Sequence, residues 1–134
     1  AEFLKRTGNY SGRRVIFNVS SGVARRPKIS WSVYSAAKAG LEAFSAAIQK
    51  ELTGDPKAKV ITFDPGIMDT AMQARIRSSS EDDFPEAKRF IGFKENGELH
   101  DPRRAGEIAA KVVLGELADG QPHVKIEELI TSGH

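Results

Sequence analysis

The sequence predicts an α/β protein in which helices cover a parallel sheet. Two short runs rich in β-branched and aromatic residues, at residues 14–19 and 60–63, lack apolar and polar alternation, which is typical of parallel strands covered on both faces. A long helical pattern over residues 31–52 separates them, so the three segments form a right-handed strand-helix-strand unit. With 134 residues, 40% of them hydrophobic, the chain suffices for one domain with a core.

The elements before the second strand follow from local patterns. Residues 1–7 are expected to end a helix, which Gly8 terminates, and the first strand ends at the SSG loop of residues 20–22. The other faces of the 31–52 helix carry mostly alanine and glycine, so we expect this helix to be buried or to form a homodimer interface. Its expected apolar stripe consists of Ala37, Leu41, Phe44, Ile48 and Leu52.

A long connection follows the second strand. The strand ends at the DPG turn of residues 64–66, because proline lacks the donor for the ladder and glycine permits a sharp turn. Residues 67–100 contain helical pieces at residues 70–77 and 85–93 around an acidic, serine-rich break. A broken connection of this length after the carboxyl end of a strand predicts a substrate-binding lid.

The last part of the chain predicts one helix and one strand. Asp101 as the cap and Pro102 at the first helical position start the helix, which is expected to run to about Leu117. The glycine and proline at positions 120 and 122 are expected to end it. Residues 123–126 then predict a short edge strand.

Composition excludes several classes of function. The formal net charge of +2 is spread over scattered basic pairs and aromatic residues make up 7% of the chain, so no nucleic-acid partner is expected. The apolar runs are too short to cross a bilayer and no signal segment opens the chain, so we expect a cytoplasmic protein with no membrane partner. The absence of cysteine excludes disulfides and thiolate metal sites.

Four chemical groups converge on one edge of the predicted sheet. Tyr34 and Lys38 are four residues apart near the start of the long helix, so both project from one face. Ser21 follows the first strand, and the Pro65-Gly66 turn follows the second. Ligands of open parallel sheets bind outside the carboxyl ends of the strands, where these residues meet.

These residue types suit reduction of a carbonyl. An ammonium beside a phenol favours the phenolate, so Lys38 would prepare Tyr34 to exchange a proton with a carbonyl oxygen as hydride reaches the carbon. Ser21 would hydrogen-bond to the same oxygen. No metal is expected, since no histidine-carboxylate cluster surrounds these residues. Taken alone, a Tyr and a Lys four residues apart could also be a solvated pair.

Three motifs carry a resemblance to a known family. NVSSG at residues 18–22, YSAAK at residues 34–38 and PGIMDT at residues 65–70 resemble three ordered signatures of short-chain dehydrogenases/reductases. The 13 residues from Ser21 to Tyr34 resemble the gap of the short-form members, which act on carbonyls and alcohols. The resemblance implies the carboxy-terminal half of a doubly wound, Rossmann-type parallel sheet in a three-layer α/β/α domain.

The resemblance assigns roles to the first three residues of the site. It implies that Tyr34 is the catalytic acid/base and contacts both cofactor and substrate. Lys38 also holds the ribose hydroxyls of the nicotinamide, and Ser21 polarises the substrate carbonyl. These assignments agree with the chemistry that the residue types support.

The PGIMDT segment is implied to bind the cofactor through Pro65, Gly66, Met68, Asp69 and Thr70. Within it, backbone atoms of Met68 and the hydroxyl of Thr70 contact the nicotinamide carboxamide, and Gly66 lies beside the substrate. From the residues alone, Thr70 could be only a helix N-cap and Asp69 only a capping or turn residue.

A finer resemblance points to one branch of the family. PGIMDTAMQ at residues 65–73, GEL at residues 97–99 and HV at residues 123–124 are similar to sepiapterin reductases and to bacterial and fungal benzil reductases. Sepiapterin reductases have an acidic residue after the His-Val pair to anchor the pterin, whereas this sequence has Lys125. The expected substrate is therefore a small ketone or diketone, with a pterin-like carbonyl as the less favoured choice. NADP is the expected cofactor, because these reductases use it, with NAD as the alternative.

The amino-terminal half of such a domain has no counterpart in these 134 residues. A dinucleotide site needs a glycine-rich turn after the first strand, and none is present. The isolated chain is therefore expected to be inactive, as the carboxy-terminal portion of a single NAD(P)-binding domain. The alternative is a non-catalytic fragment or dimerisation module built on the alanine-rich helix, and in either case a homodimer or homo-oligomer through residues 31–52 is expected.

Overall fold

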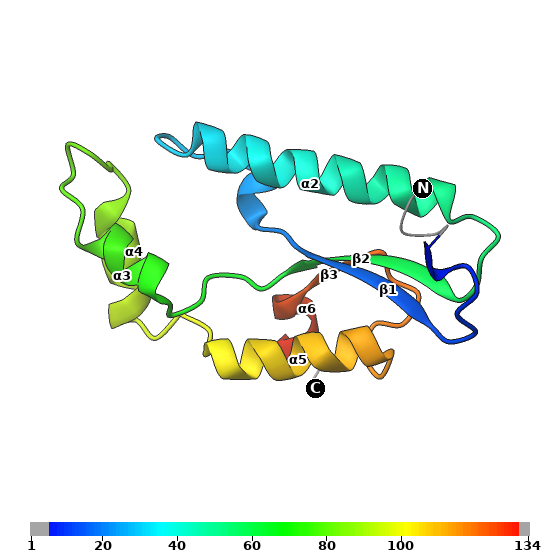
Figure 1. The fold of residues 1–134 in the computed structure, drawn as a ribbon. Coiled ribbons are helices and arrows are strands. Elements are labelled where there is room, and N and C mark those ends of the chain that lie inside the picture. Colours follow the sequence, from blue (N-terminus) through cyan, green and yellow to red (C-terminus); the bar gives the residue numbers. More distant parts are fainter. Residues whose placement is uncertain (1–5, 132–134) are drawn as a thin grey trace.

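A three-stranded parallel sheet forms the centre of the molecule in the computed structural model, which describes residues 6–131 (Figure 1). β1 (Arg14–Val19) pairs with β2 (Ala58–Asp64), and β2 pairs with β3 (His123–Lys125), so the order is β1-β2-β3. All pairs are parallel, which confirms the predicted α/β class with a parallel sheet. The strands end together, because the register aligns Asp64 with Lys125.

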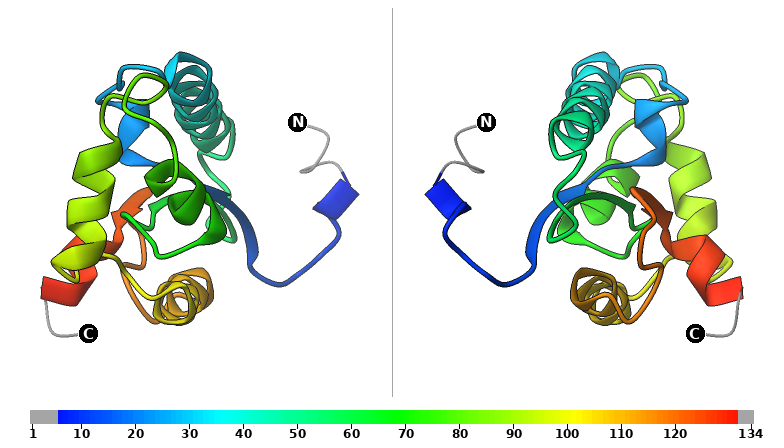
Figure 2. Two further views of the ribbon diagram at one scale, coloured as in Figure 1. Left: turned by 90° about the vertical axis from the view of Figure 1, so that its left-hand side faces the viewer. Right: turned by 90° about the vertical axis from the view of Figure 1, so that its right-hand side faces the viewer.

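Helices cover both faces of this sheet. In Figure 1, α2 (Ser32–Glu51) lies along one face and α5 (Pro102–Leu114) along the other, which gives the expected three layers. α6 (Ile126–Thr131) follows β3 directly, on the α5 side. Figure 2 shows the segment before β1 turning away from these layers. Among the helices of residues 6–131, none has the length and apolar character that a membrane span requires.

Two apolar cores hold the layers together. The smaller one, between the sheet and α2, consists of Leu52, Ala58 and Val60, with Ile16 and Ile48 against them. The larger one lies between the sheet and the α5 side, and its buried members are Ile61, Phe63, Ala105, Ile108, Val112, Val124 and Ile126. Burial of apolar side chains on both faces explains why neither long strand alternates in sequence.

The apolar stripe expected on α2 is only partly correct. Leu52 is buried and Leu41 is half-buried, but Phe44 is 54% exposed and Ala37 is also exposed. Ser45 is buried in their place, because its hydroxyl accepts a hydrogen bond from the Asn18 amide of β1 at 2.8 Å. Polar contacts therefore rotate the helix away from the orientation that apolar spacing alone predicts.

The connection over residues 67–100 leaves the carboxyl edge of the sheet and returns to it. It contains α3 (Ala71–Arg77) and α4 (Ala87–Glu95), which stand beyond the end of β2 in Figure 1. Its two ends are joined by a bridge between Met68 and His100, where the His100 amide donates to Ile67 at 2.8 Å and the Asp69 amide donates to His100 at 3.0 Å. The connection also has its own core of Phe84, Ala87 and Phe90.

Other bounds differ from the expectations in small ways. α5 ends at Leu114 rather than near Leu117, because Gly115 adopts a left-handed conformation (φ 82°) and terminates it. The short helices α6 and η1 (Gly22–Ala24) were not expected. Arg6 and Thr7 are helical, and the rest of the helix expected over residues 1–7 lies outside the described residues.

Candidate active site

Ser21 stands at the point where β1 ends. The preceding residue, Ser20, donates its amide to the Phe63 carbonyl of β2 at 2.7 Å, so the end of β1 is still held by the sheet. Ser21 is extended (φ −161°, ψ 151°) and precedes η1, to which its side chain makes no capping hydrogen bond. The hydroxyl is therefore not used to hold the local backbone and can serve a ligand.

Lys38 links the end of β1 to Tyr34. Both residues lie in the first two turns of α2, four positions apart, and point to the same side as expected. The Lys38 ammonium donates to the carbonyl of Val19 at 2.8 Å and lies 5.7 Å from the centroid of the Tyr34 ring. The structure thus brings a phenol, an ammonium and the Ser21 segment together at the carboxyl edge of the sheet.

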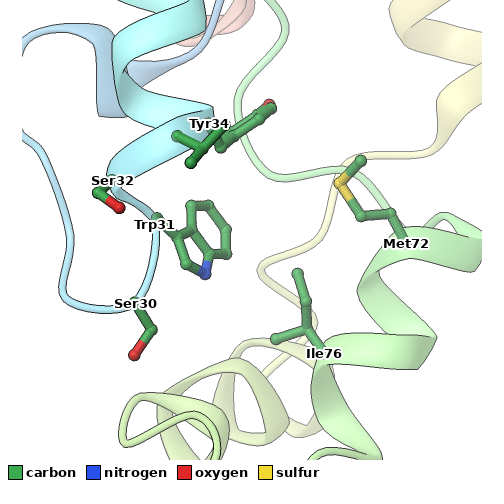
Figure 3. Close-up of a pocket in the computed structure, with 7 residues that line it drawn as sticks. Ser30, Trp31, Ser32, Tyr34, Met72 and Ile76 are labelled. Carbon is green, nitrogen blue, oxygen red and sulfur yellow. The ribbon is translucent and has the colours of Figure 1, made fainter.

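Trp31 places a pocket beside Tyr34. The two rings meet edge to face, with centroids 5.4 Å apart, and the indole stacks on Phe84 with centroids 5.6 Å apart. A cavity of about 420 Å³ is lined by Trp31, the N-cap of α2, by Tyr34 from α2, and by Met72 and Ile76 from α3 (Figure 3). The Tyr34 hydroxyl points away from the indole in this view. Sequence reasoning identified Trp31 as a packing residue and a possible pocket wall, and the structure shows both.

Met72 and Ile76 were missed as pocket residues. They are four positions apart on α3, the first helix after the PGIMDT segment, so they share a face. This spacing was the available signal, because it presents two apolar side chains from the start of the connection toward the Tyr34 end of α2. Both side chains extend toward the cavity in Figure 3.

Gly66 adopts a backbone conformation that favours glycine. Its φ of +67° lies in the left-handed region, and its amide donates to the Asp64 carboxylate at 3.1 Å. A Cβ at this position would lie 2.5 Å from Oε1 of Glu127 and 2.8 Å from the His100 ring. The residue after Pro65 therefore turns tightly against α6 and the end of the connection, and its predicted contact with substrate stays a prediction.

Thr70 and Asp69 have structural roles in the arrangement described. Thr70 is the N-cap of α3, and its hydroxyl accepts the amide of Gln73 at 3.4 Å. The Asp69 carboxylate accepts a hydrogen bond from Lys94 and pairs with Arg77 at 3.5 Å. The hydrogen bond from Lys94 lowers the pKa of Asp69, against the opposing effect of desolvation. The predicted contacts of Met68, Asp69 and Thr70 with the cofactor stay predictions.

Comparison with known proteins supports the resemblance seen in the motifs. The family model described as short chain dehydrogenase matches residues 4–81. A benzil reductase ((S)-benzoin forming) of Bacillus subtilis is 38% identical over 128 residues, which are 95% of this chain and 51% of that protein. A sepiapterin reductase of Xenopus tropicalis is 33% identical over 106 residues, covering 78% of this chain and 37% of that protein.

A solved structure extends this likeness to the fold. The crystal structure of the KRED1-Pglu enzyme superposes with a TM-score of 0.69 at 30% identity, over 82% of this chain and 46% of that one. This likeness confirms the α/β, Rossmann-like class. The chain spans about half the length of the curated relatives it matches. The family match over more than half of its residues, and the extent of its likeness to reductases, show that this chain belongs to the short-chain dehydrogenase/reductase family.

Proposed function

We propose that this chain is the catalytic, carboxy-terminal half of an NAD(P)H-dependent reductase that acts on a small ketone or diketone. The observation that carries the proposal is the Lys38 ammonium, held by the Val19 carbonyl and lying 5.7 Å from the Tyr34 ring, next to a cavity. The edge of β1 opposite β2 has no partner strand among residues 6–131, which suits a missing amino-terminal half of the sheet.

The residues present fit the nicotinamide end of such a cofactor. Lys38 uses one of its donors on Val19, so two remain for ribose hydroxyls, and the PGIMDT loop lies at the carboxyl edge beyond β2. When bound, the cofactor supplies the hydride. We propose NADP, as the resemblance to these reductases implies. NAD is the alternative, because the residues that read the adenine ribose belong to the half without a counterpart here.

In the proposed reaction, residues of this chain transfer the proton and orient the substrate carbonyl. Tyr34 donates its hydroxyl proton to the carbonyl oxygen as the carbon becomes an alcohol carbon, and in the reverse direction it accepts that proton. Lys38 stabilises the negative charge that develops on the phenol oxygen. Ser21 donates a hydrogen bond to the same substrate oxygen. Its hydroxyl is available for this role because it does not cap η1.

The apolar lining of the cavity supports an apolar substrate. Trp31, Met72 and Ile76 offer an aromatic face, a thioether and a branched aliphatic side chain around Tyr34. A ketone or diketone with an aromatic group suits these walls, as the relatives named benzil reductase suggest. A pterin is less favoured, since Lys125 stands after the His-Val pair and faces Glu128 at 3.5 Å.

We also propose that the protein forms a homodimer through the outer face of α2. Val33 is 82% exposed and Phe44 is 54% exposed, and the residues between them on this face are mostly alanine and glycine. An apolar face with small side chains permits close approach of a second helix. Light scattering of the full-length protein measures the mass.

We further propose that residues 67–100 act as a lid and that the protein is cytoplasmic.

The test is Tyr34→Phe in the full-length protein, assayed by NADPH oxidation with diketones, aryl ketones and pterins. We expect kcat to fall by at least about 100-fold, because the proton donor is lost, with an unchanged circular dichroism spectrum. Tyr10→Phe is the matched control, since this exposed tyrosine lies outside the site. Full turnover by Tyr34→Phe would contradict the proposed function.

The second candidate is a non-catalytic dimerisation module. It is favoured by the exposed Phe44 face and by the chain's coverage of about half of each relative. Such a module would self-associate without binding nicotinamide. Titration of NADPH fluorescence against the full-length protein separates the two candidates, because only the reductase changes the emission.

A further inference from the structure

The side chain of Glu42 joins the two ends of the segment that contains Ser21. Oε1 of Glu42 accepts the hydroxyl of Ser20 at 2.7 Å, and Oε2 accepts Nε of Arg25 at 3.0 Å. Ser20 immediately precedes residues 21–24 and Arg25 immediately follows them. One carboxylate therefore clasps this four-residue segment from both sides, and we call the Ser20-Glu42-Arg25 contacts the clasp.

The two arms of the clasp differ in exposure, since the bond between Ser20 and Glu42 is partly buried and the pair of Arg25 and Glu42 is exposed. The Ser20 side chain is buried at the end of β1, and the Glu42 side chain is 20% exposed. The Arg25 side chain is half-exposed, but its Nη2 donates to Nδ1 of His123 at 2.8 Å. Arg25 is thereby held from β3 as well as from α2. A charged hydrogen bond with limited solvent access fixes geometry more strongly than an exposed pair does.

Glu42 stands on the same side of α2 as the proposed catalytic groups. Tyr34, Lys38 and Glu42 follow each other at intervals of four residues, so they form a row along the helix. Lys38 donates to Val19 and Glu42 accepts from Ser20, which are neighbouring residues at the end of β1. The row therefore sets the position of the strand end relative to the helix that carries the phenol.

Within residues 6–131, the backbone hydrogen bonds of the segment inside the clasp are local. Within it, the Ala24 amide donates to the Ser21 carbonyl at 2.9 Å, and beyond it the Arg26 amide donates to Gly22 at 3.0 Å. These bonds are local, so they shape η1 without fixing where it lies relative to α2. Val23 is buried and supplies an apolar contact, but an apolar contact defines direction poorly.

We propose that Glu42 is a positioning residue that holds the Ser21 hydroxyl at the correct place relative to Tyr34. This inference rests on the proposed function, since it needs Ser21 to polarise the substrate carbonyl. Glutamine at position 42 can still bond to the Ser20 hydroxyl through its amide, but it carries no charge, so the contact with Arg25 becomes a weaker, neutral hydrogen bond. Loss of one of the two contacts frees one end of the segment.

The first experiment combines Glu42→Gln with Ser21→Ala in the full-length protein. We expect Glu42→Gln alone to lower kcat about tenfold with little change in the KM for NADPH, because the hydroxyl is misplaced. In the Ser21→Ala background we expect no further loss, since Glu42 acts through Ser21. An equal loss in both backgrounds would show a merely structural role and overturn the proposal, and so would an unchanged kcat in Glu42→Gln.

Arg25→Met keeps the proposal testable where Glu42→Gln does not fold. Arg25 is half-exposed, so this variant removes only one arm of the clasp, and we expect a smaller loss of kcat that also disappears in the Ser21→Ala background. Glu107→Gln is the matched control for loss of a carboxylate, because Glu107 is exposed on α5. Equal losses for Arg25→Met with and without Ser21 would again overturn the proposal.

The second experiment needs no turnover, so it separates this inference from the proposed function. Hydrogen exchange of the full-length protein without substrate reports the amides of residues 22–26. We expect exchange there to be at least about threefold faster in Glu42→Gln and unchanged in Glu107→Gln. Unchanged exchange in Glu42→Gln would overturn the clasp. Absence of reductase activity in the unaltered protein would instead contradict the proposed function while leaving the clasp measurable.

Discussion

The two faces of the sheet are held by different kinds of contact. On the α5 side, Phe63, Ile108 and Val112 are buried in a continuous apolar cluster. On the α2 side, the apolar cluster is confined to the far end of the helix around Leu52, and toward the carboxyl edge polar contacts such as that of Lys38 with Val19 take over. Apolar contacts tolerate small rotations, whereas hydrogen bonds specify a register. The candidate site therefore lies where hydrogen bonds, rather than apolar burial, hold the helix against the sheet.

Removing an apolar side chain from the α5 side should have the largest effect on stability. Phe63 is 1% exposed, so Phe63→Ala leaves a cavity in the larger core. We expect the free energy of unfolding of the full-length protein to fall by about 3–5 kcal/mol. Urea unfolding followed by circular dichroism measures this loss. A loss below about 1 kcal/mol would mean that the α5 side is not the main source of stability.

Removing the Ser45 hydroxyl on the α2 side should lower the free energy of unfolding by a smaller amount, which depends on whether Asn18 is still present. Ser45→Ala leaves the Asn18 amide without the acceptor that it now has, so we expect a loss of about 1–3 kcal/mol. The double variant Asn18→Val with Ser45→Ala removes both partners and should recover part of this loss. The same urea unfolding measures both. Additive losses in the double variant would contradict the idea that the contact specifies register.

A pH titration should show the smallest effect, and it reports on the contact between His123 and Arg25, the arginine of the clasp. Burial, together with the positive charge of Arg25, lowers the pKa of His123 below its usual 6.5, although Glu42 and Asp64 oppose this shift and Lys125 adds to it. The lowered pKa favours the neutral form of His123 in the folded state, and Nδ1 of this ring lies 2.8 Å from Nη2 of Arg25. The unfolded chain binds the proton more readily, so stability is fully present above pH 6.5 and is lost as the pH falls below it.

Unfolding free energies measured between pH 7.5 and pH 5.5 test this direction. His123→Gln should remove part of the dependence, because glutamine does not titrate but still offers an acceptor to Arg25. An unchanged pH dependence in this variant would assign the effect to other groups. Arg25→Met in the same series separates the contribution of the arginine to the lowered pKa of His123 from that of burial.

Much of the fold was predictable from the sequence because its signals are local. α2 begins and ends within one residue of the predicted bounds, and the Asp101 cap with Pro102 marks the start of α5 correctly. The end of α5 was misplaced because Gly115 lies inside an apolar pattern that continues to Leu117, and only its left-handed conformation shows the stop. α6 was missed because it is short and follows β3 without a turn.

The proposed catalytic residues of the site were predictable from the sequence, but the residues that hold them in position were not. Ser21, Tyr34 and Lys38 occur in signatures that can be read directly from the sequence. Glu42 and Arg25 belong to no such pattern, since their meeting depends on how α2 crosses the end of β1. The same crossing exposes Phe44 and buries Ser45, against the apolar periodicity. Contacts between polar groups that are distant in sequence cannot be read from spacing, because they require the packed fold.

The bridge between Met68 and His100 has a consequence for how proteins of this shape diversify. The connection leaves and rejoins the carboxyl edge at one pair of residues, and its core of Phe84, Ala87 and Phe90 lies largely within it. Such a segment behaves as a cassette, which can change in length and sequence without disturbing the strand register. Phe84 and Phe90 of this segment pack against the Trp31 ring, and Glu86 pairs with Lys28 at 3.5 Å. We therefore expect exchange of the cassette between relatives to succeed best when the residues at positions 28 and 31 are exchanged with it.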